Sequence, residues 1–112
     1  MKYYIIAGER SGDLHGGNLM KAIKQNDAQA EFKGFGGDYM QEAGLALSVH
    51  YKDMAFMGFI EFLSNLNTIS NYIKQCKREI SEWKPDVVIL IDYAGFNRRI
   101  GNFCKKSGIT VF

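Results

Sequence analysis

The chain has 112 residues, of which 46% are hydrophobic and 23% are charged, and its formal net charge is +2. This length fits one ordinary domain or part of a larger protein, and the composition is typical of a soluble globular protein. A charge this small does not indicate nucleic-acid binding, and no stretch reaches the ~20 apolar residues of a membrane-spanning helix.

Two further features bear on the cellular compartment. The two cysteines, Cys76 and Cys104, form no CxxC pair, which argues against structural zinc or a redox motif. The N-terminal sequence MKYYIIAGE lacks the long apolar core of a signal peptide. We therefore expect a cytoplasmic protein with reduced thiols.

The first half of the chain predicts three strands alternating with two helices. Residues Lys2–Ala7 are aromatic and β-branched and end at a glycine, as a buried strand does. The helix that follows reaches about Asn26, and either Ser11 or Asp13 can cap its start. The pattern then predicts a strand at Ala30–Phe35, a short helix at Asp38–Glu42 that stops at Gly44, and a strand at Leu45–Val49.

The second half predicts a long helix, a central strand, a second helix and a final strand. Apolar residues step by three or four from Gly58 to about Trp83. Asp86–Ile91 is almost continuously apolar, which is typical of a parallel strand covered on both faces. We expect DYAGF to be a loop, Asn97–Lys106 to be a helix that Asn97 caps, and the residues after Gly108 to be a strand.

Strands that alternate with helices predict an α/β fold, a Rossmann-like parallel sheet with flanking helices. The last residues of the sequence form an apolar run, whereas domains usually end in polar, exposed residues. We therefore expect the chain to be the front piece of a longer protein.

Two loops of unusual polar content come directly after predicted strands. GERSGD, residues 8–13, follows the first strand, and DYAGFN, residues 92–97, follows the most apolar strand. Ligands of open α/β sheets bind beyond the carboxyl ends of the strands. We therefore expect both loops to open on the same edge of the sheet.

The first of these loops suits a sugar better than a phosphate. Gly8 and Gly12 permit tight turning and the close approach of a ligand. The helix that starts here could hold an anion, but Glu9 and Asp13 would repel phosphate, and the P-loop lysine is missing. Carboxylates can instead accept hydrogen bonds from sugar hydroxyls. The alternative is that Asp13 or Ser11 only caps the helix.

In the second loop, Asp92 is the candidate for chemistry. It follows five apolar residues at the mouth of the sheet, where a carboxyl group would be partly shielded from water. Such a group can act as a general base that takes a proton from a hydroxyl nucleophile. The alternative is that Asp92 only forms a turn or a helix cap.

Residues 54–66, MAFMGFIEFLSNL, concentrate methionine and phenylalanine around Gly58. One face of this segment would be core, but the apolar residues are too many for one stripe, so some are expected to contact lipid or a membrane. The residues expected at that contact are Met54, Phe56, Phe59, Phe62 and Leu63. The basic residues further along, which fit either an anionic lipid surface or a hydrated face, are Lys74, Lys77 and Arg78.

In order and spacing, AGERSGDLHGGNLMKAIK, MAFMGFIEFL and KPDVVILIDYAGFNRRI resemble the N-terminal part of the lipid-A-disaccharide synthases, over essentially the whole chain. The resemblance implies a glycosyltransferase of GT-B architecture, in which two Rossmann-like domains face each other over a cleft. Residues 1–112 would be the N-terminal, acceptor-side Rossmann-like domain or part of it, and the C-terminal UDP-sugar domain would lie beyond them. Members of the family join UDP-2,3-diacylglucosamine to 2,3-diacylglucosamine 1-phosphate and release UDP, on the way to lipid A in Gram-negative bacteria.

The resemblance also implies inversion at the anomeric carbon, no metal or other cofactor, and a peripheral place on the inner face of the inner membrane. Asp92 matches the acid that is proposed as the base on the acceptor 6-hydroxyl. The residues that match the family's substrate-binding motifs are Gly8, Glu9, Ser11, Gly12, Asp13, Met57, Gly58, Glu61, Phe96 and Asn97.

Two positions depart from the family's pattern. Arg10 stands where a small residue is usual, and it could touch a phosphate or point outward. Ala94 stands where a proline is usual, which loosens the turn after Asp92. Two alternative functions remain at this point: another GT-B enzyme such as a UDP-sugar epimerase, and a flavodoxin-like binding module without catalysis. If the chain is part of a lipid-A-disaccharide synthase, we expect residues 1–112 alone to transfer no sugar.

Overall fold

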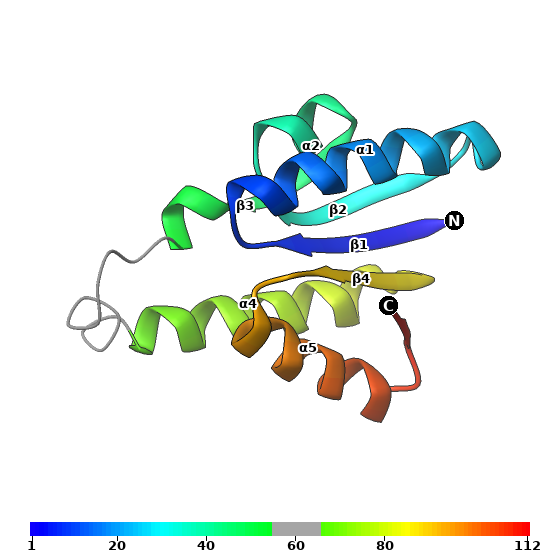
Figure 1. Cartoon of the computed structure of the whole chain (residues 1–112). Helices are drawn as coiled ribbons and strands as arrows, with labels where there is room; N and C mark the ends of the chain where they lie inside the picture. Colours follow the sequence, from blue (N-terminus) through cyan, green and yellow to red (C-terminus); the bar gives the residue numbers. More distant parts are fainter. Residues whose placement is uncertain (55–65) are drawn as a thin grey trace.

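The computed structural model describes residues 1–54 and 66–112, which form a five-stranded parallel sheet between two layers of helices (Figure 1). The strand order is β3-β2-β1-β4-β5. The strands are β1 (Lys2–Ala7), β2 (Glu31–Gly36), β3 (Leu45–His50), β4 (Val87–Ile91) and β5 (Thr110–Val111). All four neighbouring pairs are parallel, so the predicted Rossmann-like α/β fold is confirmed.

The helices lie on opposite faces of this sheet. Figure 1 shows α1 and α2 on one side and α4 and α5 on the other. The helices are α1 (Arg10–Asn26), α2 (Asp38–Glu42), the 3₁₀ turn η1 (Tyr51–Met54), α4 (Leu66–Trp83) and α5 (Ala94–Lys106). None of these helices is both long enough and apolar enough to cross a bilayer.

Strand β1 lies at the centre of the sheet and supplies both halves of the core. Ile5 and Ala7 point into the cluster beneath α1 and α2, whereas Tyr4 and Ile6 point into the cluster beneath α4 and α5. All four side chains are fully buried. This explains why the sequence of β1 reads as a continuous apolar run, since parallel strands covered on both faces do not alternate with polar residues.

Helix α4 packs on the sheet through residues at helical spacing. Ile73, Cys76 and Ile80 are buried in the core, as the apolar periodicity predicts. Burial raises the pKa of the Cys76 thiol to about 12, so this group stays protonated at neutral pH. Cys76 and Cys104 are both free thiols, as expected.

A polar network also joins α4 to the sheet. The Glu79 carboxylate accepts hydrogen bonds from the hydroxyls of Tyr4 in β1 and Ser48 in β3, and from the side-chain amide of Gln75 one turn earlier. Burial and the nearby Cys76 and Glu79 raise the pKa of the Tyr4 hydroxyl, which therefore remains a donor. The network fixes α4 against two strands, in addition to its apolar contacts.

Several element boundaries differ from the prediction. Helix α5 begins at Ala94, three residues before the predicted start, and Tyr93 is its N-cap. The prediction that Asn97 caps α5 is therefore wrong, because Asn97 lies inside the helix and its backbone N–H donates to the carbonyl of Tyr93. A 3₁₀ turn that the sequence analysis does not include forms at η1. The predicted helix start at Gly58 lies outside the described residues.

Candidate functional site

The loops after β1 and β4 lie next to each other at the carboxyl edge of the sheet. Strands β1 and β4 are parallel neighbours, and their last residues, Ala7 and Ile91, are register partners. The prediction that GERSGD and DYAGFN open on one edge is therefore confirmed. Chain order also reverses here, because β1 is followed by β2 on one side and bordered by β4 on the other. Such switch points are where open α/β sheets form ligand crevices.

Tyr93 joins the two loops. A Cβ atom on Gly8 would lie 2.3 Å from Cγ of Tyr93, so the ring lies directly against the Gly8 backbone. The same ring stacks on Phe96, with centroids 5.2 Å apart. Burial, and then the neighbouring Tyr72, raise the pKa of the Tyr93 hydroxyl, which stays protonated. The sequence alone does not indicate this role of Tyr93, because its partner Gly8 is remote in sequence.

We expect Gly8→Ala to destabilise the fold by about 1–3 kcal/mol, because the new methyl group forces the Tyr93 ring out of its position. The measurement is urea denaturation, monitored by circular dichroism. Gly95→Ala is the matched control, since a Cβ there meets nothing within 4 Å. The control should be neutral or slightly stabilising, because alanine favours helix over glycine. Equal losses in both variants would contradict the close contact between Gly8 and Tyr93.

The backbone at Asp92 adopts an uncommon conformation. Asp92 and Tyr93 have φ angles of 49° and 60°, both in the left-handed region. Each such residue costs about 1–2 kcal/mol, although aspartate tolerates the region better than tyrosine does. The side-chain amide of Asn97 donates a hydrogen bond to the backbone carbonyl of Asp92 and holds the turn in place. Strain of this kind is often found at functional sites.

The side chain of Asp92 is exposed, so the predicted partial shielding of this carboxyl from water is wrong. Within residues 1–54 and 66–112 it forms no ion pair. Its carboxylate is thus accessible at the switch point. Asn97, in contrast, is buried, and its Oδ1 atom has no hydrogen-bond partner among the described residues.

Glu9 lies on the β1 side of the same edge. It is the exposed N-cap of α1, with extended backbone and no side-chain capping bond. Its carboxylate accepts a 3.3 Å hydrogen bond from the hydroxyl of Ser11, which is also exposed. The predicted capping of α1 by Ser11 or Asp13 is therefore wrong. Glu9 and Ser11 instead present polar atoms beside the loop that carries Asp92.

Asp13 has a structural role that the sequence did not predict. Its side chain is 1% exposed and accepts three backbone hydrogen bonds, from Gly37 at 2.8 Å and from Tyr39 and Met40 at 3.0 Å each. These N–H groups begin helix α2, whose N-cap is Gly37. Asp13 therefore caps a neighbouring helix and ties the start of α1 to the start of α2. This occupies the carboxylate that we expected to bind substrate.

Gly12 also serves the packing of α1. A Cβ atom there would lie 3.2 Å from the Cβ of Ala7 and 3.4 Å from a methyl group of Ile91. The glycine thus brings the first turn of α1 close to the ends of β1 and β4. The close backbone contact that we predicted at Gly12 is thus a contact with the sheet. Contact between Gly12 and a ligand remains a prediction.

The other predicted site residues fall into two groups. Phe96 and Met54 are buried in the core beneath α4 and α5, with exposures of 5% and 3%, so their side chains are covered by protein. The second group lies outside the described residues and comprises Phe56, Met57, Gly58, Phe59, Glu61, Phe62 and Leu63.

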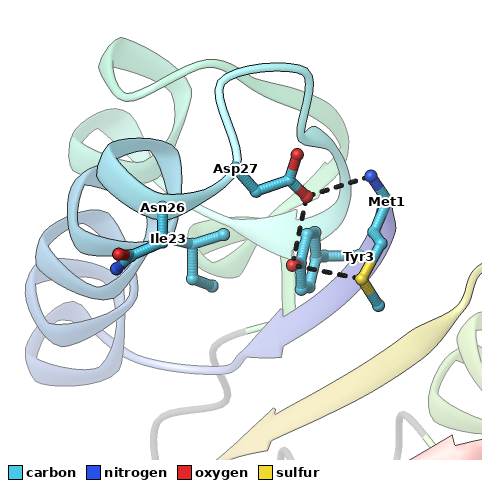
Figure 2. A pocket seen from close by; sticks show the side chains of 5 residues that line it. All are labelled: Met1, Tyr3, Ile23, Asn26 and Asp27. Atoms are coloured by element: carbon cyan, nitrogen blue, oxygen red, sulfur yellow. Dashed lines mark hydrogen bonds and ion pairs between the residues drawn. The ribbon is translucent and has the colours of Figure 1, made fainter.

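Two surface pockets lie at opposite ends of the strands. One, of about 380 Å³, opens at the carboxyl edge and is lined by Arg10, Asp13, Asp38, Tyr39, Glu42, Tyr51 and Lys52. The other, of about 540 Å³, lies near the start of β1 and is shown in Figure 2. There the terminal amine of Met1 pairs with Asp27 at 3.0 Å, and this contact lowers the pKa of the Asp27 carboxyl. Of these two, the first adjoins the candidate site. A further pocket of about 400 Å³ lies along α5, and its lining includes Ala94 and Asn97 of the second loop.

Comparison with known proteins identifies a family whose members resemble this chain over nearly its whole length. The family of lipid-A-disaccharide synthetases matches residues 3–111. The chain is 42% identical over 107 residues to a lipid-A-disaccharide synthase of Trichlorobacter lovleyi and 40% identical to one of Geobacter metallireducens. A third, from Coxiella burnetii, is 36% identical. Each match covers 96% of this chain and 28% of the relative, so the chain spans little more than a quarter of their length.

Proposed function

The chain belongs to the lipid-A-disaccharide synthetase family, and from this premise we propose that it forms the acceptor-side part of a glycosyltransferase. The reaction joins UDP-2,3-diacylglucosamine to 2,3-diacylglucosamine 1-phosphate and releases UDP. The observation that carries the proposal is the exposed carboxylate of Asp92 at the switch point, beside the loop that carries Glu9. A UDP-sugar domain in the remainder of the protein would complete the site.

In the proposed reaction, Asp92 acts as the general base. Its carboxylate takes the proton of the acceptor 6-hydroxyl while that oxygen attacks the anomeric carbon of the donor. The bond from this carbon to the diphosphate oxygen breaks, UDP leaves with the bonding electrons, and the configuration inverts. Glu9 would accept hydrogen bonds from sugar hydroxyls, and the Ser11 hydroxyl would accept or donate them. The rigid turn at Asp92 and Tyr93 would hold the base in one position, which lowers the entropic cost of the step.

The acyl chains of both substrates suggest where the enzyme works. We place it on the inner face of the inner membrane as a peripheral protein, because substrates of this kind reside in a bilayer. The sequence around Gly58 supports contact with acyl chains, since it concentrates methionine and phenylalanine.

A chimeric enzyme tests the proposed function. These 112 residues would replace the aligned N-terminal segment of the Trichlorobacter lovleyi relative, and UDP and disaccharide would be measured with both substrates present. We expect the two products in equal amounts, and none from the 112-residue chain alone. A folded chimera that makes no disaccharide would contradict the proposal. Conversion of the UDP-sugar without acceptor would instead support an epimerase.

A further inference from the structure

We propose that the pocket beside Arg10 binds the phosphorylated hexosamine head group of the acceptor, with Arg10 and Lys52 as ligands of its phosphate. This rim pocket is lined by Arg10, Asp13, Asp38, Tyr39, Glu42, Tyr51 and Lys52. The proposal rests on the proposed function, because that reaction supplies the phosphorylated sugar. It assigns a role to Tyr39 in α2 and to Tyr51 and Lys52 in η1, which lie outside the sequence motifs that match the family.

The rim pocket lies at the same edge of the sheet as Asp92. Its walls come from the segments that follow β1, β2 and β3, which are Arg10 in α1, Tyr39 in α2 and Tyr51 in η1. In the sheet, β1, β2 and β3 follow one another beyond β4. The rim pocket therefore lies along the same edge, on the side of Asp92 that faces β3. A sugar whose 6-hydroxyl faces Asp92 could therefore place its phosphate further along this edge.

The charges around the rim pocket leave two cations available. The repulsion of phosphate that the sequence predicts for Asp13 is partly offset, because its carboxylate accepts three backbone hydrogen bonds. A second carboxylate, that of Asp38, pairs with His50 at 3.1 Å. Arg10 and Lys52 are both exposed and form no ion pair with any described residue. A phosphate between them would gain charge-assisted hydrogen bonds, and the guanidinium can bind two of its oxygens at once.

The remaining wall residues suit a sugar ring. Tyr39 and Tyr51 each combine an apolar ring face with a hydroxyl group, and the Glu42 carboxylate can accept hydrogen bonds from sugar hydroxyls. Inorganic phosphate alone would leave these groups unused, and Glu42 would repel it. The volume of about 380 Å³ lies within the range of small-molecule sites.

The wall of the rim pocket is fixed before any ligand arrives. A Cβ on Gly37 would lie 2.3 Å from the Tyr51 ring, and this ring packs against His50 with centroids 4.7 Å apart. Asp13 holds the start of α2 from the other side. A preformed wall reduces the ordering cost of binding, which then falls mainly on the exposed side chains of Arg10, Glu42 and Lys52.

A titration of the 112-residue chain with glucosamine 1-phosphate tests the inference. Binding is monitored through the amide chemical shifts in NMR spectra. We expect the shifts to concentrate at Arg10, Tyr39 and Lys52. Arg10→Ala and Lys52→Ala should each weaken binding by roughly tenfold, the loss of one charge-assisted contact. Lys106→Ala, which removes an exposed cation at the end of α5, is the matched control and should bind normally.

Glu42→Gln separates recognition of the sugar from attraction to the phosphate. It should weaken binding of glucosamine 1-phosphate and strengthen binding of inorganic phosphate, because the repulsion between carboxylate and phosphate is lost. The inference is overturned if glucosamine 1-phosphate does not bind, if its shifts lie elsewhere, or if Arg10→Ala has no effect. It is also overturned if UDP binds these residues more tightly, which would make this a donor site. None of these results depends on transfer by the chimera, so the two proposals can fail separately.

Discussion

Asp92→Asn is expected to lower disaccharide formation by the chimeric enzyme by about 10²- to 10⁴-fold, the usual contribution of a general base. The KM for the acceptor should change little, because asparagine keeps the shape of the side chain and its hydrogen-bonding oxygen. The fold should also be kept, since asparagine tolerates the left-handed backbone that Asp92 adopts. The measurement is the initial rate of UDP release at saturating and at limiting acceptor concentrations.

Glu82→Gln is the control for this variant, because it removes a carboxylate that is also exposed, at the end of α4. The control should retain full activity. A second comparison is Glu9→Gln, which we expect to raise the KM for the acceptor more than it lowers kcat, since Glu9 is proposed to bind hydroxyls. If Asp92→Asn retained most of the activity, another group would have to be the base, and the proposed mechanism would be wrong.

Local sequence patterns were sufficient to predict the architecture. The continuous apolar runs of β1 and β4 indicated strands covered on both faces, and Ile73, Cys76 and Ile80 follow the period that predicts α4. The shared edge of the two loops followed from the parallel arrangement alone. These features depend on residues that are close in sequence, which is why a pattern can reveal them.

Contacts between remote residues could not be predicted in the same way. Asp13 looked like the cap of its own helix, because the sequence does not show that the backbone of Gly37 and Met40 lies beside it. The ring of Tyr93 packs on Gly8, which is 85 positions earlier in the chain. The start of α5 was misplaced for a related reason, since Tyr93 provides an N-cap without any of the usual capping residues.

The structure also shows the position of Ala94, which stands where a proline is usual in the family. Ala94 is the first residue of α5, a position at which proline is favoured because its N–H group needs no partner within the helix. Alanine therefore changes how firmly the helix start is fixed, and it removes no group that contacts substrate in the proposed reaction. Arg10, in contrast, adds a cation to the rim pocket.

Asp13→Ala is expected to destabilise the protein by about 3–5 kcal/mol, because the buried N–H groups of Gly37 and Met40 lose their acceptor and a cavity remains. Asp13→Asn should cost about 2–4 kcal/mol, since an amide offers one acceptor oxygen and turns its NH₂ group toward backbone donors. The free energy of unfolding, measured by urea denaturation, tests both values.

Asp38→Asn is the matched control, because Asp38 is exposed and its carboxylate pairs only with His50 among the described residues. It should cost less than about 1 kcal/mol, as surface ion pairs do. The same comparison separates structure from substrate binding at Asp13. If Asp13→Asn left stability unchanged but weakened binding of the acceptor, the carboxylate would serve the ligand directly, and the capping of α2 would be energetically minor. Loss of stability without any change in binding by the remaining folded protein would assign Asp13 to the scaffold that holds the rim pocket.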